Sequence, residues 1–252
     1  MTNPFGNLKD DNLEAAQDTL GGYAPLPSGI YSGTIKAIYA GKSDGGAHNV
    51  TVLLDLGGRE LRETIYISNK KGENWYPNKQ SPDKKLPLPG FTIANDLALV
   101  ATGLPLSEQP FEDKILNVYD PEQRKEVPKS VSVMVDAIGK PVSVAVLNVL
   151  ENKAVKDQSG NYIDTAETRN SNTIDKVFDT DSKMTVAEAR EQKTGGIFWA
   201  KWSEMNSGKV RDKRTIKDGA AGSASSGKPV MRPTSSGAGA EAPRKSLFGQ
   251  PK

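Results

Sequence analysis

The chain reads Asn49-Val-Thr-Val-Leu-Leu-Asp-Leu56, then Gly57-Gly58, then Arg59-Glu-Leu-Arg-Glu-Thr-Ile-Tyr-Ile-Ser68, and this stretch decides the fold class. Apolar residues alternate with others in both runs, which is the period of a β-strand with two unlike faces. The glycine pair predicts a tight hairpin turn between the two strands. On the second strand Glu63 interrupts the apolar face, and the opposite face carries Glu60, Arg62, Thr64 and Tyr66.

The regions on either side add one strand before this hairpin and a helix and two strands after it. Residues 28–39 alternate in the same way and are predicted as a strand. Apolar residues recur at helical spacing in Phe91–Gly103, so a helix is predicted there, with Thr92 as its N-cap and Gly103 as its stop. The last two predicted strands are Val131–Ile138 and Val142–Leu150.

This order predicts a mainly β protein of the α+β type. Three strands, one helix and two strands fit an OB-fold-like Greek-key barrel, although other α+β folds share the order. Further along, Thr185 and Glu188 have the spacing of a capping box for a short helix, and Ile197–Trp202 is expected to be a strand that returns to the barrel or lies beside it.

Three parts are predicted along the chain. Residues 1–27 form an N-terminal arm with a short helix near residues 12–18, residues 28–207 form the OB-like domain with a C-terminal elaboration, and residues 208–252 form a disordered tail. The segment 209–252 holds ten Lys or Arg against three Asp or Glu, so it is basic whereas the body is acidic. Its apolar tip, Leu247 and Phe248, is expected to contact a partner protein; the alternative is an ordinary chain end.

Composition argues against most enzyme classes. The 252 residues include no cysteine and one histidine, His48, which excludes thiol chemistry and multi-histidine zinc sites. Asp179 and Asp181, together with Asp164, could bind a divalent ion, but two loop aspartates without further ligands are more often solvated turn formers. No window approaches the roughly 20 apolar residues of a membrane helix. We therefore expect a soluble intracellular protein with no catalytic residue, no metal, no cofactor and no membrane contact.

The stretch from Tyr66 to Phe91 is the most informative for function. It holds five lysines against two acidic residues, and Tyr66, Trp75, Tyr76 and Phe91 are interleaved with them. A single-stranded nucleic acid would use both residue types, because bases stack on aromatic rings and ammonium groups neutralise phosphates. The alternative is that Trp75 and Tyr76 form a small satellite core under a long loop, with the lysines as its solvated rim.

The predicted interface has two groups of residues. The bases would stack on Tyr66, Trp75 and Tyr76, and the phosphates would be held by Arg59, Arg62, Lys70, Lys71, Lys79, Lys84 and Lys85. A second cluster, Trp199 and Lys201, could extend this surface, but we favour core packing for its aromatic run.

Several of these motifs resemble a known family. They are Ser28-Gly-Ile-Tyr-Ser-Gly-Thr-Ile35, Thr64–Trp75 with its Asn-Lys-Lys-Gly-Glu-Asn-Trp run, Leu88-Pro-Gly-Phe91, Ile174-Asp-Lys-Val-Phe178 and Lys245-Ser-Leu-Phe-Gly249. Together they resemble the single-stranded DNA-binding proteins of podovirus-type bacteriophages that carry a virion RNA polymerase.

The resemblance implies a protein of the host cell cytoplasm that coats single-stranded DNA during replication and recombination, without strong sequence preference. It also implies a C-terminal tail that contacts replication or recombination proteins, or host RNA polymerase during late transcription. Many strand-coating proteins end in an acidic tail, whereas this tail is basic and could contact DNA as well. The alternative function is an interaction or scaffold protein whose tail docks on a polymerase, with the β-domain as a platform.

Overall fold

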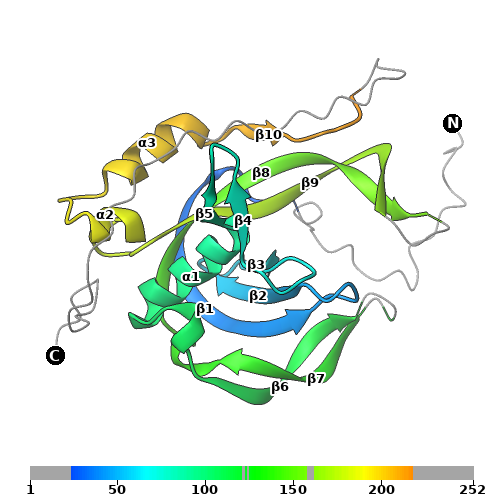
Figure 1. Ribbon diagram of the computed structural model, residues 1–252, viewed down its shortest axis with the longest axis horizontal. Helices are drawn as coiled ribbons and strands as arrows, with labels where there is room; N and C mark the ends of the chain where they lie inside the picture. Colours follow the sequence, from blue (N-terminus) through cyan, green and yellow to red (C-terminus); the bar gives the residue numbers. More distant parts are fainter. Residues whose placement is uncertain (1–23, 121–122, 124, 158–161, 218–252) are drawn as a thin grey trace, which may run out of the picture.

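The structure, a computed structural model, describes residues 24–120, 123, 125–157 and 162–217, and it is mainly β with antiparallel strands and few helices (Figure 1). Its strands are β1 (Gly29–Lys42), β2 (His48–Asp55), β3 (Glu60–Tyr66), β4 (Trp75–Asn78), β5 (Ser81–Pro87), β6 (Phe111–Asp120), β7 (Lys125–Met134), β8 (Pro141–Lys156), β9 (Tyr162–Phe178) and β10 (Val210–Asp212). Its helices are α1 (Pro89–Thr102), α2 (Val186–Arg190) and α3 (Ile197–Asn206), with 3-10 turns η1 (Leu106–Glu108) and η2 (Val135–Ala137).

The long strand β1 organises the main sheet, whose order is β10-β8-β1-β2-β3. Residues 34–42 of β1 pair with β2, and residues 29–34 pair with β8. The register shifts between Ile35 and Ala37, so Lys36 is the extra residue of a β-bulge that bends the strand. Because of this bulge, Ile35 and Ile38 enter the same core, although the strict alternation of the sequence would place them on opposite faces.

The hairpin predicted at Gly57-Gly58 is confirmed. Both glycines have positive φ, 73° and 88°, which is the backbone conformation of the type I′ turn that connects tightly paired strands. The carboxylate of Asp55 accepts a hydrogen bond from the Gly58 N–H at 2.7 Å and stabilises the turn.

Helix α1 confirms the predicted helix, but its start differs. It begins at Pro89 after the N-cap residue Leu88, whereas Thr92 lies in its first turn and donates its hydroxyl to the Leu88 carbonyl at 3.3 Å. Proline suits this first position because its missing N–H has no helical partner there. Gly103, with φ 81°, ends the helix as predicted.

The buried apolar residues form three clusters. The largest lies between α1 and the inner faces of the main sheet and includes Leu97, Val52 and Val144. A second lies under α3 and consists of Ala145, Leu147, Val149, Phe178 and Trp202. A third, of Ala37, Tyr39, Leu53 and Val133, lies between β1–β2 and the arm formed by β6 and β7. Strand β2 is therefore buried on both faces. Val50, Val52 and Leu54 face the largest cluster, and the β6–β7 arm covers the opposite face, which carries Leu53.

The region after β8 differs most from the sequence predictions. The strand expected at Ile197–Trp202 is wrong, because these residues begin helix α3, in which Trp199 and Trp202 are one turn apart and pack on the same cluster. Strand β9 was missed because polar and charged residues fill its outer half. The capping box is confirmed, since Thr185 Oγ1 accepts from the Glu188 N–H and the Glu188 carboxylate accepts from the Thr185 N–H.

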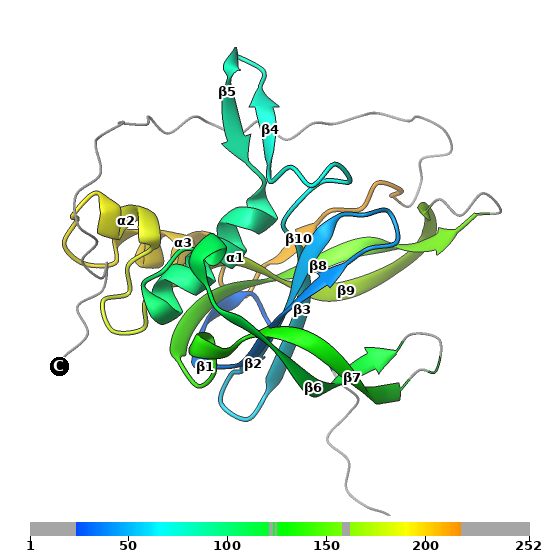
Figure 2. The same ribbon diagram turned by 60° about the horizontal axis from the view of Figure 1, so that its bottom comes forward.

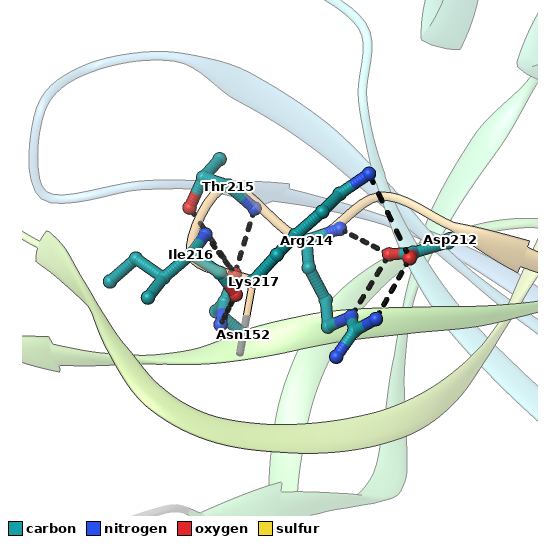
Figure 3. A network of polar contacts seen from close by, with 6 residues as sticks. All are labelled: Asn152, Asp212, Arg214, Thr215, Ile216 and Lys217. Atoms are coloured by element: carbon teal, nitrogen blue, oxygen red, sulfur yellow. Dashed lines mark hydrogen bonds and ion pairs between the residues drawn. The ribbon is translucent and has the colours of Figure 1, made fainter. Parts of the chain in front are cut away.

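Order extends further toward the C-terminus than predicted. Strand β10 lies parallel to β8, which contradicts a disordered tail from residue 208 onward. Figure 3 shows how Asn152 on β8 holds the next residues: its Oδ1 accepts from the N–H groups of Thr215 at 2.8 Å and Ile216 at 3.0 Å. The remaining tail with Leu247 and Phe248, and residues 1–23 of the predicted arm with its helix, lie outside the described residues. The last residues of that arm are part of the folded body, because Leu26 is buried in the largest cluster and its backbone is hydrogen-bonded to the Asn172 side chain.

Candidate nucleic-acid interface

The stretch after β3 forms a protruding hairpin rather than the long loop that the sequence suggested. A turn begins it, because the Asn69 side-chain oxygen accepts hydrogen bonds from the N–H groups of Lys71 at 2.9 Å and Glu73 at 3.0 Å. Strands β4 and β5 then pair only with each other and project from the body (Figure 2). The Leu88 N–H donates to the Asn74 carbonyl at 2.8 Å, which closes the hairpin at the start of α1.

Trp75 and Tyr76 are half-buried on this hairpin. Neither ring belongs to any of the three buried clusters, so neither is part of a satellite core of buried residues. The ammonium nitrogen of Lys85 lies 3.8 Å from the centroid of the Trp75 ring. This cation–π contact holds a positive charge on one face of the ring.

The five lysines of this stretch, Lys70, Lys71, Lys79, Lys84 and Lys85, are all exposed. Within the described part of the chain none of them forms an ion pair, whereas Lys36, Arg62 and Lys153 are examples of cations that do. Their charges are therefore available to an anionic ligand. Tyr66 lies just before the hairpin at the end of β3, with 54% of its surface exposed.

The two predicted arginines are engaged within the protein. Arg62 on β3 forms an ion pair with Glu126 of β7 at 2.6 Å and lies 3.7 Å from Glu60. Arg59 donates a hydrogen bond to the Ala24 carbonyl. Neither guanidinium is as available to a phosphate as the lysines of the hairpin.

Trp199 and Lys201 lie on a different element, α3. The Trp199 ring meets Phe178 edge to face, with their centroids 5.1 Å apart, so the favoured interpretation of core packing describes it correctly. Lys201 is exposed on the same helix. The structure does not bring this pair onto the β4–β5 hairpin.

A groove that the sequence analysis missed lies between β1–β3 and the β6–β7 arm. Its volume is about 530 Å³, and its lining includes Lys42, Thr64, Arg62, Tyr119 and Lys129. Tyr119 is 49% exposed. The apolar residues Leu116 and Val118, two positions apart, were the available signal for β6, since both side chains pack on the third cluster.

Two carboxyl groups are partly buried away from this surface. Burial raises the pKa of Glu63, although its carboxylate accepts hydrogen bonds from Thr173 Oγ1 and from the Ile174 N–H, both at 2.6 Å. Burial also raises the pKa of Asp96 on α1 to about 6, against the opposing attraction of Arg190 and Lys176. Glu63 thus connects β3 to β9, which explains why a carboxylate interrupts the apolar face of β3.

Asp179 and Asp181, which the sequence analysis considered as metal ligands, belong to a turn. Among the described residues, no group of three or more His, Cys, Asp or Glu lies close enough together to hold an ion. The Asp179 carboxylate instead accepts hydrogen bonds from the Ser182 N–H at 2.8 Å and hydroxyl at 2.7 Å, as expected of a turn former.

The described part of the chain contains no helix of the length and apolarity required to span a bilayer. Comparisons with protein-family models and with curated proteins found no match for this chain.

Proposed function

We propose that the protein binds single-stranded DNA without strong sequence preference, through the β4–β5 hairpin and the adjoining end of β3. The observation that carries this proposal is the combination on one protruding element of half-exposed rings with lysines that have no ion-pair partner. Half-exposed rings and cations without ion-pair partners lie close together on this projecting hairpin. A single-stranded nucleic acid matches such a surface, because its bases stack on the rings and its phosphates are neutralised by the lysines.

The roles within this surface follow from exposure. Tyr66, Trp75 and Tyr76 provide rings for stacking, and the five hairpin lysines provide charge along the sugar-phosphate backbone. Because Lys85 covers one face of Trp75, a base either uses the other face or replaces the ammonium, which then moves to a phosphate. On the family resemblance, the protein acts in phage DNA replication and recombination, is not an enzyme, and works in the host cytoplasm.

We further propose an OB-type barrel as the scaffold. The strand sequence β3-β2-β1-β8-β9 supports it, with α1 placed between β3 and β8 along the chain. Within the described residues β3 and β9 share no backbone ladder, and the Glu63 carboxylate spans them instead. In this arrangement β6 and β7 are an insertion between the helix and the fourth barrel strand.

Tryptophan fluorescence during titration with oligo(dT) tests the function. We expect saturable quenching, weaker binding as salt rises, and much weaker binding of duplex DNA of the same length. The Trp75→Phe variant is the control for the origin of the signal, since Trp199 and Trp202 remain in their cluster and should contribute little quenching. Equal affinity for duplex and single strands, or no binding, would contradict the proposal.

A protein-docking platform remains the second candidate, and the anchoring of residues 213–216 favours it. The backbone of Lys213 donates to the Leu150 carbonyl at 2.9 Å, and Asn152 holds Thr215 and Ile216, so the tail leaves the body from a fixed point. A truncation after Lys217 keeps β10 and removes the rest of the tail. Oligo(dT) binding that survives this truncation assigns DNA to the folded body, and binding that disappears assigns it to the tail.

A further inference from the structure

The β6–β7 arm is attached to the body mainly at its base. Strand β7 lies beside β1 (Figures 1 and 2), and the two strands share one backbone bridge, between Tyr39 and Val133. The side chains of Leu116, Val118 and Val131 pack on the third cluster. Toward the tip, residues 125–132 pair only with β6. The described contacts of this outer part with the body are therefore made by side chains.

An ion-pair network joins the outer part of the arm to β3. Glu126, opposite Tyr119 in the β6–β7 ladder, reaches Arg62 at 2.6 Å. Arg62 also lies 3.7 Å from Glu60, whose carboxylate pairs with Lys36 at 2.8 Å. In the groove between arm and body, the guanidinium of Arg62 is thus occupied by carboxylates.

Arg62 is incompletely satisfied by these partners. Its Nε is buried and has no hydrogen-bond partner within the described chain, while the contact to Glu126 uses only Nη2. A guanidinium presents its donors as a planar fork that matches two oxygens of a phosphate. Because Nε is buried, a phosphate that replaces Glu126 engages both Nε and Nη2 only if the guanidinium moves toward the groove as Glu126 leaves.

The rest of the groove suits a single-stranded nucleic acid. Lys42 and Lys129 line it, are exposed and form no ion pair within the described part of the chain. Tyr119 adds a half-exposed ring on the arm, and Thr64 adds a hydroxyl on the β3 face. Two free ammonium groups, one fork-shaped donor and one ring are the groups that a nucleotide unit uses.

We propose that this groove is a second contact for the single strand, in which Glu126 occupies Arg62 in the free protein and a backbone phosphate displaces it on binding. This inference rests on the proposed function. Glu126 acts as an internal competitor: its carboxylate holds the Nη2 of Arg62 at 2.6 Å, and its release frees this guanidinium for the phosphate and lets the outer part of the arm adjust around the strand while Tyr119 stacks on a base.

Glu126→Gln tests the competition, with Glu112→Gln as its matched control. Both remove one negative charge from the same arm, but Glu112 pairs with Lys114 at 3.0 Å on β6 and does not contact Arg62. We expect Glu126→Gln to tighten oligo(dT) binding about two- to fivefold, the range set by the strength of an exposed ion pair. Glu112→Gln should change affinity less than about 1.5-fold, because a distant charge is screened by salt.

Tyr119→Ser provides an independent test in case the Gln variants alter the arm. It should weaken oligo(dT) binding with an unchanged melting temperature, because the ring is exposed and lies outside the third cluster. Equal effects of the two Gln variants, or weaker binding by Glu126→Gln, would overturn the proposed displacement. Wild-type protein that fails to bind oligo(dT) would instead overturn the proposed function itself.

Discussion

Trp75 and Trp199 are both aromatic residues with a lysine near the ring, but the two rings pack differently in the structure. Each ring has a lysine over it, Lys85 at 3.8 Å from Trp75 and Lys183 at 5.7 Å from Trp199. Trp199, however, packs against the buried ring of Phe178 at a centroid distance of 5.1 Å. Trp75 lies on a two-stranded hairpin outside the buried clusters. An aromatic residue beside a lysine therefore says little about binding until the packing of the other ring face is known.

The largest effect expected from this contrast is on stability. Trp199→Ala should lower the free energy of unfolding by about 2 to 4 kcal/mol, because it removes a large ring from the cluster under α3. Oligo(dT) affinity of the folded fraction should stay the same. Urea denaturation and a titration below the transition measure the two effects. Trp199→Phe is the control and should recover part of the stability, and a loss of DNA affinity in it would place α3 in the interface.

Trp75→Ala should show the reverse behaviour. Loss of one stacking ring should cost about 1 to 3 kcal/mol of binding free energy. The free energy of unfolding should change by about 1 kcal/mol or less, since Trp75 lies outside the three buried clusters and the contact with Lys85 is lost. Fluorescence anisotropy of labelled oligo(dT) reports the affinity without relying on tryptophan. A large drop in melting temperature with unchanged affinity would instead make Trp75 a structural residue.

The sequence predicts well those elements whose signal is local. The turn at Gly57-Gly58 needs two residues with positive φ, and the capping box at Thr185 needs a fixed spacing, so both can be identified without tertiary information. The composition of the β4–β5 stretch likewise indicated its rings and lysines. The sequence did not reveal that this stretch is a hairpin, because β4 is only four residues long and both strands contain proline.

Features that depend on distant partners could not be predicted. Lys36 looks like an ordinary strand residue, and only its register against β2 shows that it is a bulge. Glu63 appears to be an error in the apolar face until Thr173 and Ile174 of β9 supply its hydrogen bonds. The groove was missed for the same reason, since the contact of Arg62 with Glu126 joins residues 64 positions apart in the sequence.

The titration of Asp96 on α1 should change the stability of the protein with pH without changing DNA binding by the β4–β5 hairpin. Asp96 lies near Arg190 of α2, on the side of the molecule that supports α3, and burial raises its pKa from 3.8 to about 6. Since the folded-state pKa is raised, its contribution to stability is complete below pH 3.8 and is lost as the pH rises through about 6. Asp96→Asn should therefore stabilise the protein by about 1 to 2 kcal/mol at pH 7.

The measurement is a series of denaturation curves from pH 4 to 8 for wild type and Asp96→Asn. The difference between the two proteins isolates Asp96 from Glu63, whose pKa is raised in the same direction. Oligo(dT) affinity should not differ between them at any pH in this range, because the hairpin is a separate element. A constant difference in stability across the series would show that Asp96 does not titrate as expected.

The smallest effect compares two exposed lysines, Lys84 on the hairpin and Lys201 on α3. Lys84→Gln should weaken oligo(dT) binding by about two- to threefold and reduce the slope of log affinity against log salt by about 0.7, the value for one contact to a single-stranded phosphate. Lys201→Gln removes the same charge and should change neither quantity. Because both variants have the same net charge, a difference in slope between them reports contact with the strand rather than long-range attraction. Slopes that are reduced equally in both variants would show that the strand also crosses α3. Trp75 and Trp199 would then differ in how their rings pack, but not in whether they lie near the bound DNA.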